Sequence, residues 1–195
     1  MVAICVFCAS SELIGRHYLE LAADLGTEIA ARGHSLVTGG GSVSMMGAIA
    51  RATRAGGGHT TGVIPRALLD KEIADHDADE LIVVDTMRER KGIMDARSDA
   101  FITMAGGIGT FEELFEIWTA RTLGMHDKPI VVLDPDGLFE QLREQLDTLV
   151  EEGFLRAGTL EAMVWTSSVQ DAVTLAEGSG SVPPPDEGEL LESEV

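Results

Sequence analysis

The sequence predicts a single α/β domain in which helices flank a parallel β-sheet. Short apolar runs alternate with amphipathic stretches along the 195 residues, a pattern typical of repeated strand–helix–strand units. The length suits one sizeable core rather than two. We therefore expect a doubly wound, Rossmann-like sheet over residues 1–177. Residues 178–195 are rich in glycine, serine, proline and acids, which predicts a disordered tail.

The first part of the chain supplies two strands and the helix between them. The apolar run Ala3–Ala9 is predicted to be the first strand. Gly15–Arg32 follows as a helix with apolar residues along one face, and Gly33 ends it, as glycine often does. Ser35–Thr38 is the second predicted strand. This order is that of a strand–helix–strand unit.

Glycine and proline mark the ends of the predicted elements in the next segment. Gly39–Gly41 breaks the chain before a predicted helix over Met45–Ala55. Thr60–Ile64 is expected to be the third strand, and Pro65 closes it. Arg66–Glu80 is polar and is predicted to be irregular, with one helical turn at most.

The remainder of the domain repeats the same alternation. The apolar runs predict strands at Leu81–Val84, Ala100–Met104, Pro129–Leu133 and Met163–Trp165. The amphipathic stretches predict helices at Thr86–Arg97, Thr110–Leu123, Leu138–Glu152 and Val169–Ala176.

Charge and hydropathy exclude several classes of function. The net charge of −19 argues against a nucleic-acid polymer as partner, because phosphate backbones are bound by clustered Lys and Arg. The apolar run Val2–Ala9 lacks a basic leader and is too short to span a bilayer. We therefore expect a cytoplasmic protein without a signal peptide or membrane anchor. The only lysines are Lys71, Lys91 and Lys128.

Cys5 and Cys8 form a Cys-x-x-Cys pair, which raises the question of a redox or metal site. Redox pairs of this spacing lie where a helix begins, whereas these two lie in a predicted strand, on opposite faces. The sequence holds no second cysteine pair to complete a zinc site. We expect buried structural thiols and no bound metal, and the five histidines show no ligand spacing either.

Two strand-to-helix turns are unusually rich in glycine, Gly39–Gly41 and Gly106–Gly109. Ligands of doubly wound sheets bind beyond the carboxyl ends of the strands. There glycine permits close backbone approach, and the N–H groups at a helix N-terminus favour phosphate. These turns therefore predict a nucleotide site, although tight chain connection is an alternative reading. The sequence has no P-loop motif, and Ser42–Ser44 interrupts a dinucleotide fingerprint, which argues against ATP and NAD.

Glu113 admits two interpretations. Thr110-x-x-Glu113 has the pattern of a capping box, in which the glutamate only bonds the start of a helix and Thr110 is its N-cap. Alternatively, an acid beside a bound sugar phosphate is placed to act on a glycosidic bond. The turn alone does not separate these two readings.

Arg90, Met94 and Arg97 share one face of a predicted helix. Cations near a helix N-terminus oppose its dipole, so this placement favours a nearby anion. The alternative is a solvated basic face that pairs with Glu89 and Asp95.

Two motifs lie close together in the chain: Met-x-x-Arg-Lys at 87–91 and Gly-Gly-x-Gly-Thr-x-x-Glu at 106–113. Together they resemble the Lonely Guy family, the cytokinin riboside 5′-monophosphate phosphoribohydrolases, whose relatives often carry the label lysine decarboxylase. Further matching segments span nearly the whole domain: Val6–Ser11, Gly39–Gly41 with Met46-Gly47, Val63–Pro65 and Leu123–Pro129. Ala105 departs from the family, which has proline there, and this change is expected to cost rigidity rather than chemistry.

The resemblance implies an enzyme that hydrolyses the N-glycosidic bond of N6-substituted AMP, and AMP itself as a further candidate, to free base and ribose 5-phosphate. It implies Arg90 and Glu113 as the catalytic pair, a phosphate site at Gly107–Thr110, no cofactor, and a homodimer with its active site near the interface. The substrate-binding residues that it implies are Gly40, Gly41, Glu72, Lys91, Gly107, Ile108, Gly109, Thr110, Phe111, Glu112 and Thr119.

Two other functions compete with this reading. One is a non-catalytic nucleotide-binding sensor or carrier on the same fold. The other is a lysine decarboxylase, which needs a lysine that forms a Schiff base with pyridoxal phosphate. None of the three lysines lies in a recognisable context for that cofactor. Phe115 and Trp118 fit either a core or a dimer contact.

Overall fold

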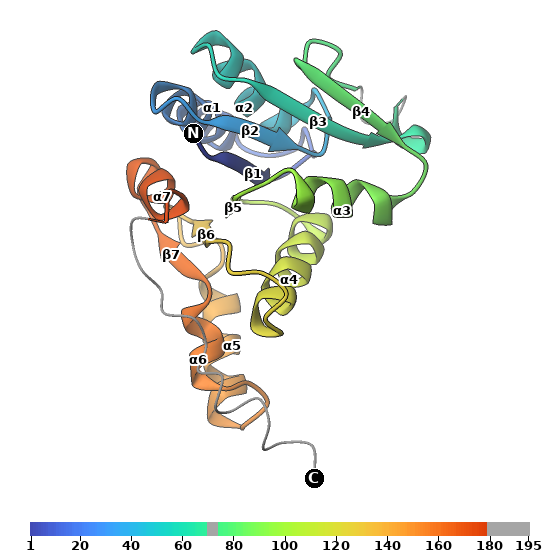
Figure 1. Ribbon diagram of the computed structural model, residues 1–195. Helices are drawn as coiled ribbons and strands as arrows, with labels where there is room; N and C mark the ends of the chain where they lie inside the picture. Colours follow the sequence, from blue (N-terminus) through green and yellow to red (C-terminus); the bar gives the residue numbers. More distant parts are fainter. Residues whose placement is uncertain (70–73, 179–195) are drawn as a thin grey trace.

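A seven-stranded parallel sheet runs through the molecule in the order β4-β3-β2-β1-β5-β6-β7 (Figure 1). The computed structural model describes residues 1–69 and 74–178. The strands are β1 (Ala3–Phe7), β2 (Ser35–Thr38), β3 (Thr60–Pro65), β4 (Glu80–Val84), β5 (Ala100–Thr103), β6 (Ile130–Leu133) and β7 (Val164–Thr166). The chain winds outward from β1 to β4 and then resumes at β5, on the other side of β1. This reversal confirms the predicted doubly wound α/β domain.

Helices cover both faces of the sheet (Figure 1). They are α1 (Arg16–Ala31), α2 (Ser44–Ala55), α3 (Met87–Ala96), α4 (Ile108–Thr122), α5 (Glu140–Glu151), α6 (Ala157–Glu161) and α7 (Val169–Ala176), with a 3₁₀ turn at Arg66–Leu68. Alternate residues of β1 belong to different cores, because successive side chains of a strand point to opposite faces. Ile4 packs in the core under α1, α2 and α7, and Cys5 packs in the core under α3, α4 and α5.

Helices α1 and α2 approach each other closely through Gly26. A Cβ atom on Gly26 would lie 2.5 Å from the carbonyl oxygen of Ile49, a separation that real side chains do not adopt. The hydroxyl of Thr53 donates to the carbonyl of Ile49 at 2.9 Å and stays buried beside this contact. Burial of the apolar faces of both helices against β1 and β2 then supplies most of the stabilisation of this layer.

Trp118 belongs to the core and not to an exposed surface. It is 5% exposed, and its indole Nε1 donates to the carbonyl of Thr159 at 2.9 Å. Thr159 lies in α6, a helix that the sequence did not predict because five residues are too few for a periodic pattern. The partly buried Phe115 packs beside Trp118, with ring centroids 6.0 Å apart.

The other differences from the predicted elements are confined to their ends. Strand β1 ends at Phe7 rather than Ala9, and α4 begins at Ile108 rather than Thr110. The predicted irregular segment Arg66–Glu80 contains the expected single helical turn. The predicted tail, apart from Gly178, lies outside the described residues. No helix within the described ranges is both long and apolar enough to cross a membrane.

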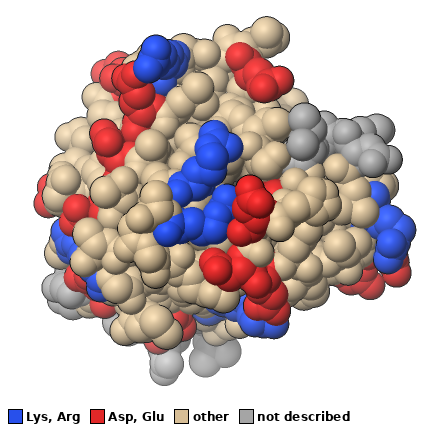
Figure 2. All heavy atoms as spheres, turned by 90° about the horizontal axis from the view of Figure 1, so that it is seen from above, with Lys and Arg blue, Asp and Glu red and all other residues tan. Residues whose placement is uncertain are grey.

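Figure 2 shows one face of the molecule, on which basic side chains form a compact group that adjoins acidic ones. Among the pairs recorded in the structure are Arg54 with Asp75 at 2.8 Å and Arg66 with Asp85 at 3.5 Å.

A polar cluster ties α7 to the start of the sheet. The Nε2 atom of His34 lies 2.8 Å from a carboxylate oxygen of Glu177, and its Nδ1 accepts from the backbone N–H of Val2 at 3.3 Å. Arg32 lies 3.5 Å from the other oxygen of Glu177. The hydrogen bond with His34 and, to a smaller extent, the charge of Arg32 lower the pKa of Glu177. The ionised carboxylate of Glu177 therefore helps to hold the end of α7 against His34 and the start of β1.

We predict that Glu177→Gln lowers the melting temperature at pH 7 and that this difference disappears at acidic pH. A carboxyl group whose pKa is lower in the folded state stabilises the fold above its unfolded pKa of about 4.3, and this contribution is lost as the pH falls through the folded pKa. Melting curves of both proteins between pH 7 and pH 3 check this. Glu144→Gln, an exposed position on α5, is the control and should give no pH-dependent difference. A difference in melting temperature between wild type and Glu177→Gln that does not change with pH would contradict the stabilising role of the ionised Glu177 carboxylate.

Candidate functional site

The strand order reverses between β1 and β5, and a pocket with about 630 Å³ of empty space opens at their carboxyl ends. Ligands of doubly wound sheets bind at such a reversal, because the turns that follow neighbouring strands diverge there. The pocket is lined by the β1–α1 turn, the start of α4, one residue of α2 and one of α3. These residues are Cys8, Ala9, Ser10, Ser11, Met46, Arg90, Gly107, Ile108, Gly109, Thr110 and Glu113.

The glycine-rich turn between β5 and α4 presents the N-terminus of α4 to this pocket. Gly107 is the N-cap residue, and no side-chain hydrogen bond caps the helix there. A helix start carries several N–H groups without intrahelical partners and a partial positive charge, which suits an anion. Gly106 makes room for Thr110, whose hydroxyl would lie 2.1 Å from a Cβ at position 106. The pocket is therefore equipped to bind a phosphate group through backbone N–H groups.

Ala105 joins this turn to the loop after β1. Its carbonyl accepts a hydrogen bond from the N–H of Ala9 at 3.0 Å. A proline at position 105 would offer the same acceptor. The alanine therefore retains the link between the two loops.

Of the two interpretations of Thr110-x-x-Glu113, the capping box does not hold. Helix α4 begins at Ile108, so Thr110 is its third residue and cannot be the N-cap. A capping box does exist in α3: the Thr86 hydroxyl accepts from the N–H of Glu89 at 3.1 Å, and the Glu89 carboxylate accepts from the N–H of Thr86 at 3.1 Å. Glu113 therefore lies one turn into α4 and lines the pocket, so helix capping does not account for it.

Arg90 is buried, so the alternative of a solvated basic face does not hold for this residue. It is 6% exposed and crosses from α3 to the ends of β2 and β3. Its Nε donates to the carbonyl of Val63 at 3.1 Å and its Nη2 to the carbonyl of Gly39 at 2.9 Å. Arg97, seven residues after Arg90, is exposed, and its Nη2 lies 3.0 Å from a carboxylate oxygen of Glu80. The solvated reading therefore holds for Arg97. The structure thus brings Arg90 into the same pocket as Glu113.

Lys91 points away from this pocket toward α4. Its ammonium group bonds the carboxylates of Glu112 and Glu116, the latter at 2.7 Å. Burial lowers the pKa of Lys91, but the hydrogen bonds to these two carboxylates outweigh burial and the net pKa is raised. Lys91 is therefore a charged residue that links α3 to α4.

The remaining predicted binding residues fall outside the pocket lining. Phe111 packs against the ring of Phe139, with centroids 5.3 Å apart, and Thr119 is exposed on α4. Gly40 has a positive φ of 78°, and Gly41 forms an isolated antiparallel bridge to Ala74. Glu72 and the adjacent Lys71 lie outside the described residues.

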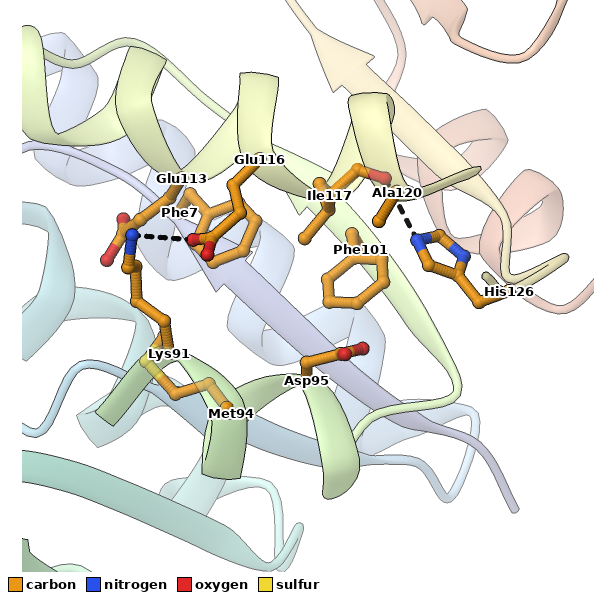
Figure 3. A pocket seen from close by; sticks show the side chains of 11 residues that line it. Phe7, Lys91, Met94, Asp95, Phe101, Glu113, Glu116, Ile117, Ala120 and His126 are labelled. Carbon is orange, nitrogen blue, oxygen red and sulfur yellow. Dashed lines mark hydrogen bonds and ion pairs between the residues drawn. The ribbon is translucent and has the colours of Figure 1, made fainter. Parts of the chain in front are cut away.

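A second pocket, with about 540 Å³ of empty space, lies between α3 and α4 and shares Glu113 with the first (Figure 3). Its apolar side chains are Phe7, Met94, Phe101, Ile117 and Ala120. Lys91, Asp95, Glu116 and His126 also line it. The His126 ring bonds the carbonyl of Ile117 at 2.9 Å, and burial lowers the pKa of this histidine. Because five apolar side chains line this pocket, a planar or branched apolar group would lose its contact with water there, next to Glu113.

Cys5 and Cys8 are buried and unpaired, as predicted. They belong to the two different cores, so their thiols lie on opposite sides of the sheet. Burial raises the pKa of both thiols, which disfavours the reactive thiolate. Among the described residues, no group of three or more His, Cys, Asp or Glu side chains is arranged to hold a metal ion.

The pocket also includes residues that sequence reasoning missed. Cys8, Ala9, Ser10, Ser11 and Met46 line it but were not among the predicted binding residues. The signal that could have found them is their position: they follow β1 and β2, whose carboxyl ends neighbour that of β5. The order of strands, which makes these turns neighbours, is a property of the tertiary fold.

Comparison with known proteins gives a consistent result. The family described as "Possible lysine decarboxylase" matches residues 46–176. A cytokinin riboside 5′-monophosphate phosphoribohydrolase of Mycobacterium tuberculosis is 54% identical over 170 residues, which cover 87% of this chain and 90% of that protein. The enzyme of the same name, LOG3, of Arabidopsis thaliana is 41% identical over 174 residues, 89% of this chain and 81% of that protein. The chain belongs to this family, the Lonely Guy family.

Solved structures place the Lonely Guy chain among proteins of the same architecture. The molybdenum cofactor carrier protein of Chlamydomonas reinhardtii superposes with a TM-score of 0.67 at 23% identity, over 91% of this chain and 96% of that one. The molybdenum cofactor binding protein of Rippkaea orientalis gives a TM-score of 0.67 at 24% identity, with the same coverage. At this level of identity the likeness concerns the fold alone.

Proposed function

We propose that this protein hydrolyses the N-glycosidic bond of cytokinin riboside 5′-monophosphates and releases the free base and ribose 5-phosphate. The observation that carries this proposal is the convergence of a buried arginine, a glutamate and an uncapped helix N-terminus on one pocket. Arg90, Glu113 and the first turn of α4 all line it. The names of the relatives agree with this reaction.

The first turn of α4 would bind the 5′-phosphate. Its N–H groups and the helix dipole attract an anion without any cationic side chain, which suits a protein with a net charge of −19. The hydroxyls of Ser10, Ser11 and Thr110 border the same pocket and can donate to phosphate oxygens. Binding energy from this remote group would then position the sugar for reaction.

Glu113 would act on the sugar. Cleavage of an N-glycosidic bond passes through an oxocarbenium-like sugar cation, which a carboxylate stabilises, as in O-glycoside cleavage. The carboxylate would also take a proton from the attacking water, whose oxygen bonds C1′ as the bond to the base nitrogen breaks. The base leaves with the electron pair and gains the proton that Glu113 took from the water, directly or through solvent, which restores the carboxylate. Arg90 would orient the anionic groups around this centre, since a guanidinium binds oxyanions in a defined plane.

The pocket between α3 and α4 would receive the substituent on the base. It adjoins Glu113 on the side away from the helix N-terminus and is walled by aromatic and aliphatic side chains (Figure 3). A ribotide whose C1′ lies at Glu113 would thus place its phosphate in one pocket and its base toward the other. Contacts of Glu72, Lys91 and Thr119 with the substrate stay predictions.

We further propose a homodimer with its interface near the site, and a cytoplasmic location. Several large apolar side chains around α4 are exposed: Ile108 at 89%, Leu123 at 58% and Met125 at 73%. Apolar side chains of this size at the ends of one helix favour contact with a second chain. The two free thiols support a reducing compartment.

The alternative functions are less well supported. A carrier that only binds a nucleotide has no use for a carboxylate at the sugar position. A Schiff base requires a neutral amine, whereas Lys91 is paired with Glu112 and Glu116, and Lys128 lies 2.7 Å from Asp95. Lys71 lies outside the described residues.

The purified protein should hydrolyse an N6-substituted AMP far faster than the corresponding riboside. Without its phosphate the substrate loses the anchor at α4, so we expect kcat/KM to fall by about 100-fold or more, consistent with the loss of several charge-assisted hydrogen bonds. Chromatography of base and ribose 5-phosphate released from both compounds measures this. Equal turnover of ribotide and riboside would refute the phosphate anchor. Prolonged incubation without any release would favour the carrier.

Glu113→Gln should lower kcat by about 100-fold to 10,000-fold, the usual contribution of a general base, with little change in KM. Glutamine has nearly the same shape, so the pocket and the phosphate contacts are retained, but it cannot accept a proton or balance a sugar cation. Steady-state kinetics on the ribotide provide the measurement. Glu151→Gln, an exposed position on α5, serves as the matched control and should behave as wild type. A Glu113→Gln protein with wild-type kcat would exclude the catalytic role.

Ala120→Leu should discriminate between substrates. The larger side chain would occupy space between α3 and α4, so kcat/KM for N6-isopentenyl-AMP should fall by about tenfold or more, the cost of overpacking a fitted pocket. Plain AMP, which lacks the substituent, should be affected by less than about twofold if it is turned over. Parallel kinetics on the two ribotides test this. A similar loss on both substrates would place the substituent elsewhere.

A further inference from the structure

Two main-chain carbonyls outside α3 accept hydrogen bonds from Arg90, and within α3 its Nη1 lies 3.8 Å from the sulfur of Met87. Nε donates to Val63 in β3 at 3.1 Å, and Nη2 donates to Gly39, directly after β2, at 2.9 Å. Two donors on different nitrogen atoms define the plane of a guanidinium. Both acceptors are main-chain carbonyls of the sheet region, so these two bonds orient the group relative to β2 and β3.

Gly39 is adjacent to the guanidinium itself. A Cβ atom at position 39 would lie 1.8 Å from Nη2, 2.8 Å from Cζ and 3.2 Å from Nε of Arg90. No side chain other than hydrogen therefore leaves the guanidinium where it is. This requirement differs from that of the neighbouring Gly40, whose positive φ of 78° favours glycine for backbone reasons.

We infer that Gly39 is a positioning residue for the reaction: it supplies both the space and a carbonyl acceptor that set the guanidinium of Arg90 in the pocket. This inference rests on the proposed function only for its kinetic consequence. The steric relation between Gly39 and Arg90 is independent of any substrate. It also gives the first glycine of the Gly39–Gly41 turn a role in orienting a side chain rather than in touching phosphate.

The test is a double-mutant cycle with Gly39→Ala, Arg90→Ala and the double variant, measured on the N6-substituted ribotide. Displacing the guanidinium should lower kcat of Gly39→Ala by about 100-fold, the scale of a 1 Å misplacement, with little change in KM because the helix N-terminus still binds phosphate. In the Arg90→Ala background the methyl group enters vacated space, so Gly39→Ala should change kcat by less than about twofold. An equal loss in both backgrounds, or wild-type kcat for Gly39→Ala, would overturn the inference.

Thermal unfolding of the same four proteins gives a readout that does not need turnover. Gly39→Ala should lower the melting temperature in the wild-type background and leave that of Arg90→Ala unchanged within about 2 °C. Gly26→Ala is the matched control, since its Cβ would crowd Ile49 far from Arg90 and should destabilise both backgrounds equally. Should Gly39→Ala alone not fold, recovery of folding in the double variant supports the inference, and continued misfolding refutes it.

The two proposals fail in distinguishable ways. A wild-type protein that does not cleave the ribotide, while the unfolding cycle shows coupling between positions 39 and 90, contradicts the proposed function alone. An active wild-type protein without coupling in either cycle contradicts the role of Gly39 alone.

Discussion

The reversal of strand order between β1 and β5 is the constraint on which the rest of the site depends. Because β2 and β6 lie on opposite sides of this central pair, the turns after β1 and β5 diverge and leave a pocket between them. The N-terminus of α4 opens into that pocket, and α3 delivers Arg90 to it from the side of β3. Residues far apart in the chain thus converge because parallel strands end at a common edge.

The proposed phosphate site would let a strongly acidic protein bind an anion through its backbone. The chain has 14 lysines and arginines against 33 acidic residues, and several of its basic side chains, such as Lys91, Lys128 and Arg54, form ion pairs that link elements of the fold. In the proposed reaction the backbone N–H groups at the start of α4 would bind the phosphate. Two neutral main-chain carbonyls, those of Val63 and Gly39, fix the plane of the Arg90 guanidinium beside this pocket.

Two identical patterns illustrate the limit of local sequence reasoning. Thr86-x-x-Glu89 and Thr110-x-x-Glu113 have the same spacing, yet the first is a capping box and the second is not. The difference arises because α4 starts at Ile108, two residues before Thr110, so Gly107 and not Thr110 is the N-cap residue. Helix starts depend on where the preceding strand ends and on the packing of the first turn. For that reason the pattern alone left Glu113 with two interpretations, and the tertiary structure removed the capping one.

The sequence by itself determined the fold class, nearly all helices and strands, the burial of both thiols and the two motifs that contain Arg90 and Glu113. Hydrophobic periodicity and glycine punctuation are local properties, so they can be read along the chain. Only the tertiary structure decided that Arg90 is buried, that Lys91 turns toward α4, and that Ser10, Ser11 and Met46 share the pocket with Glu113. These outcomes depend on strand order and on the path of one side chain past Gly39, and neither is encoded in any single stretch of residues.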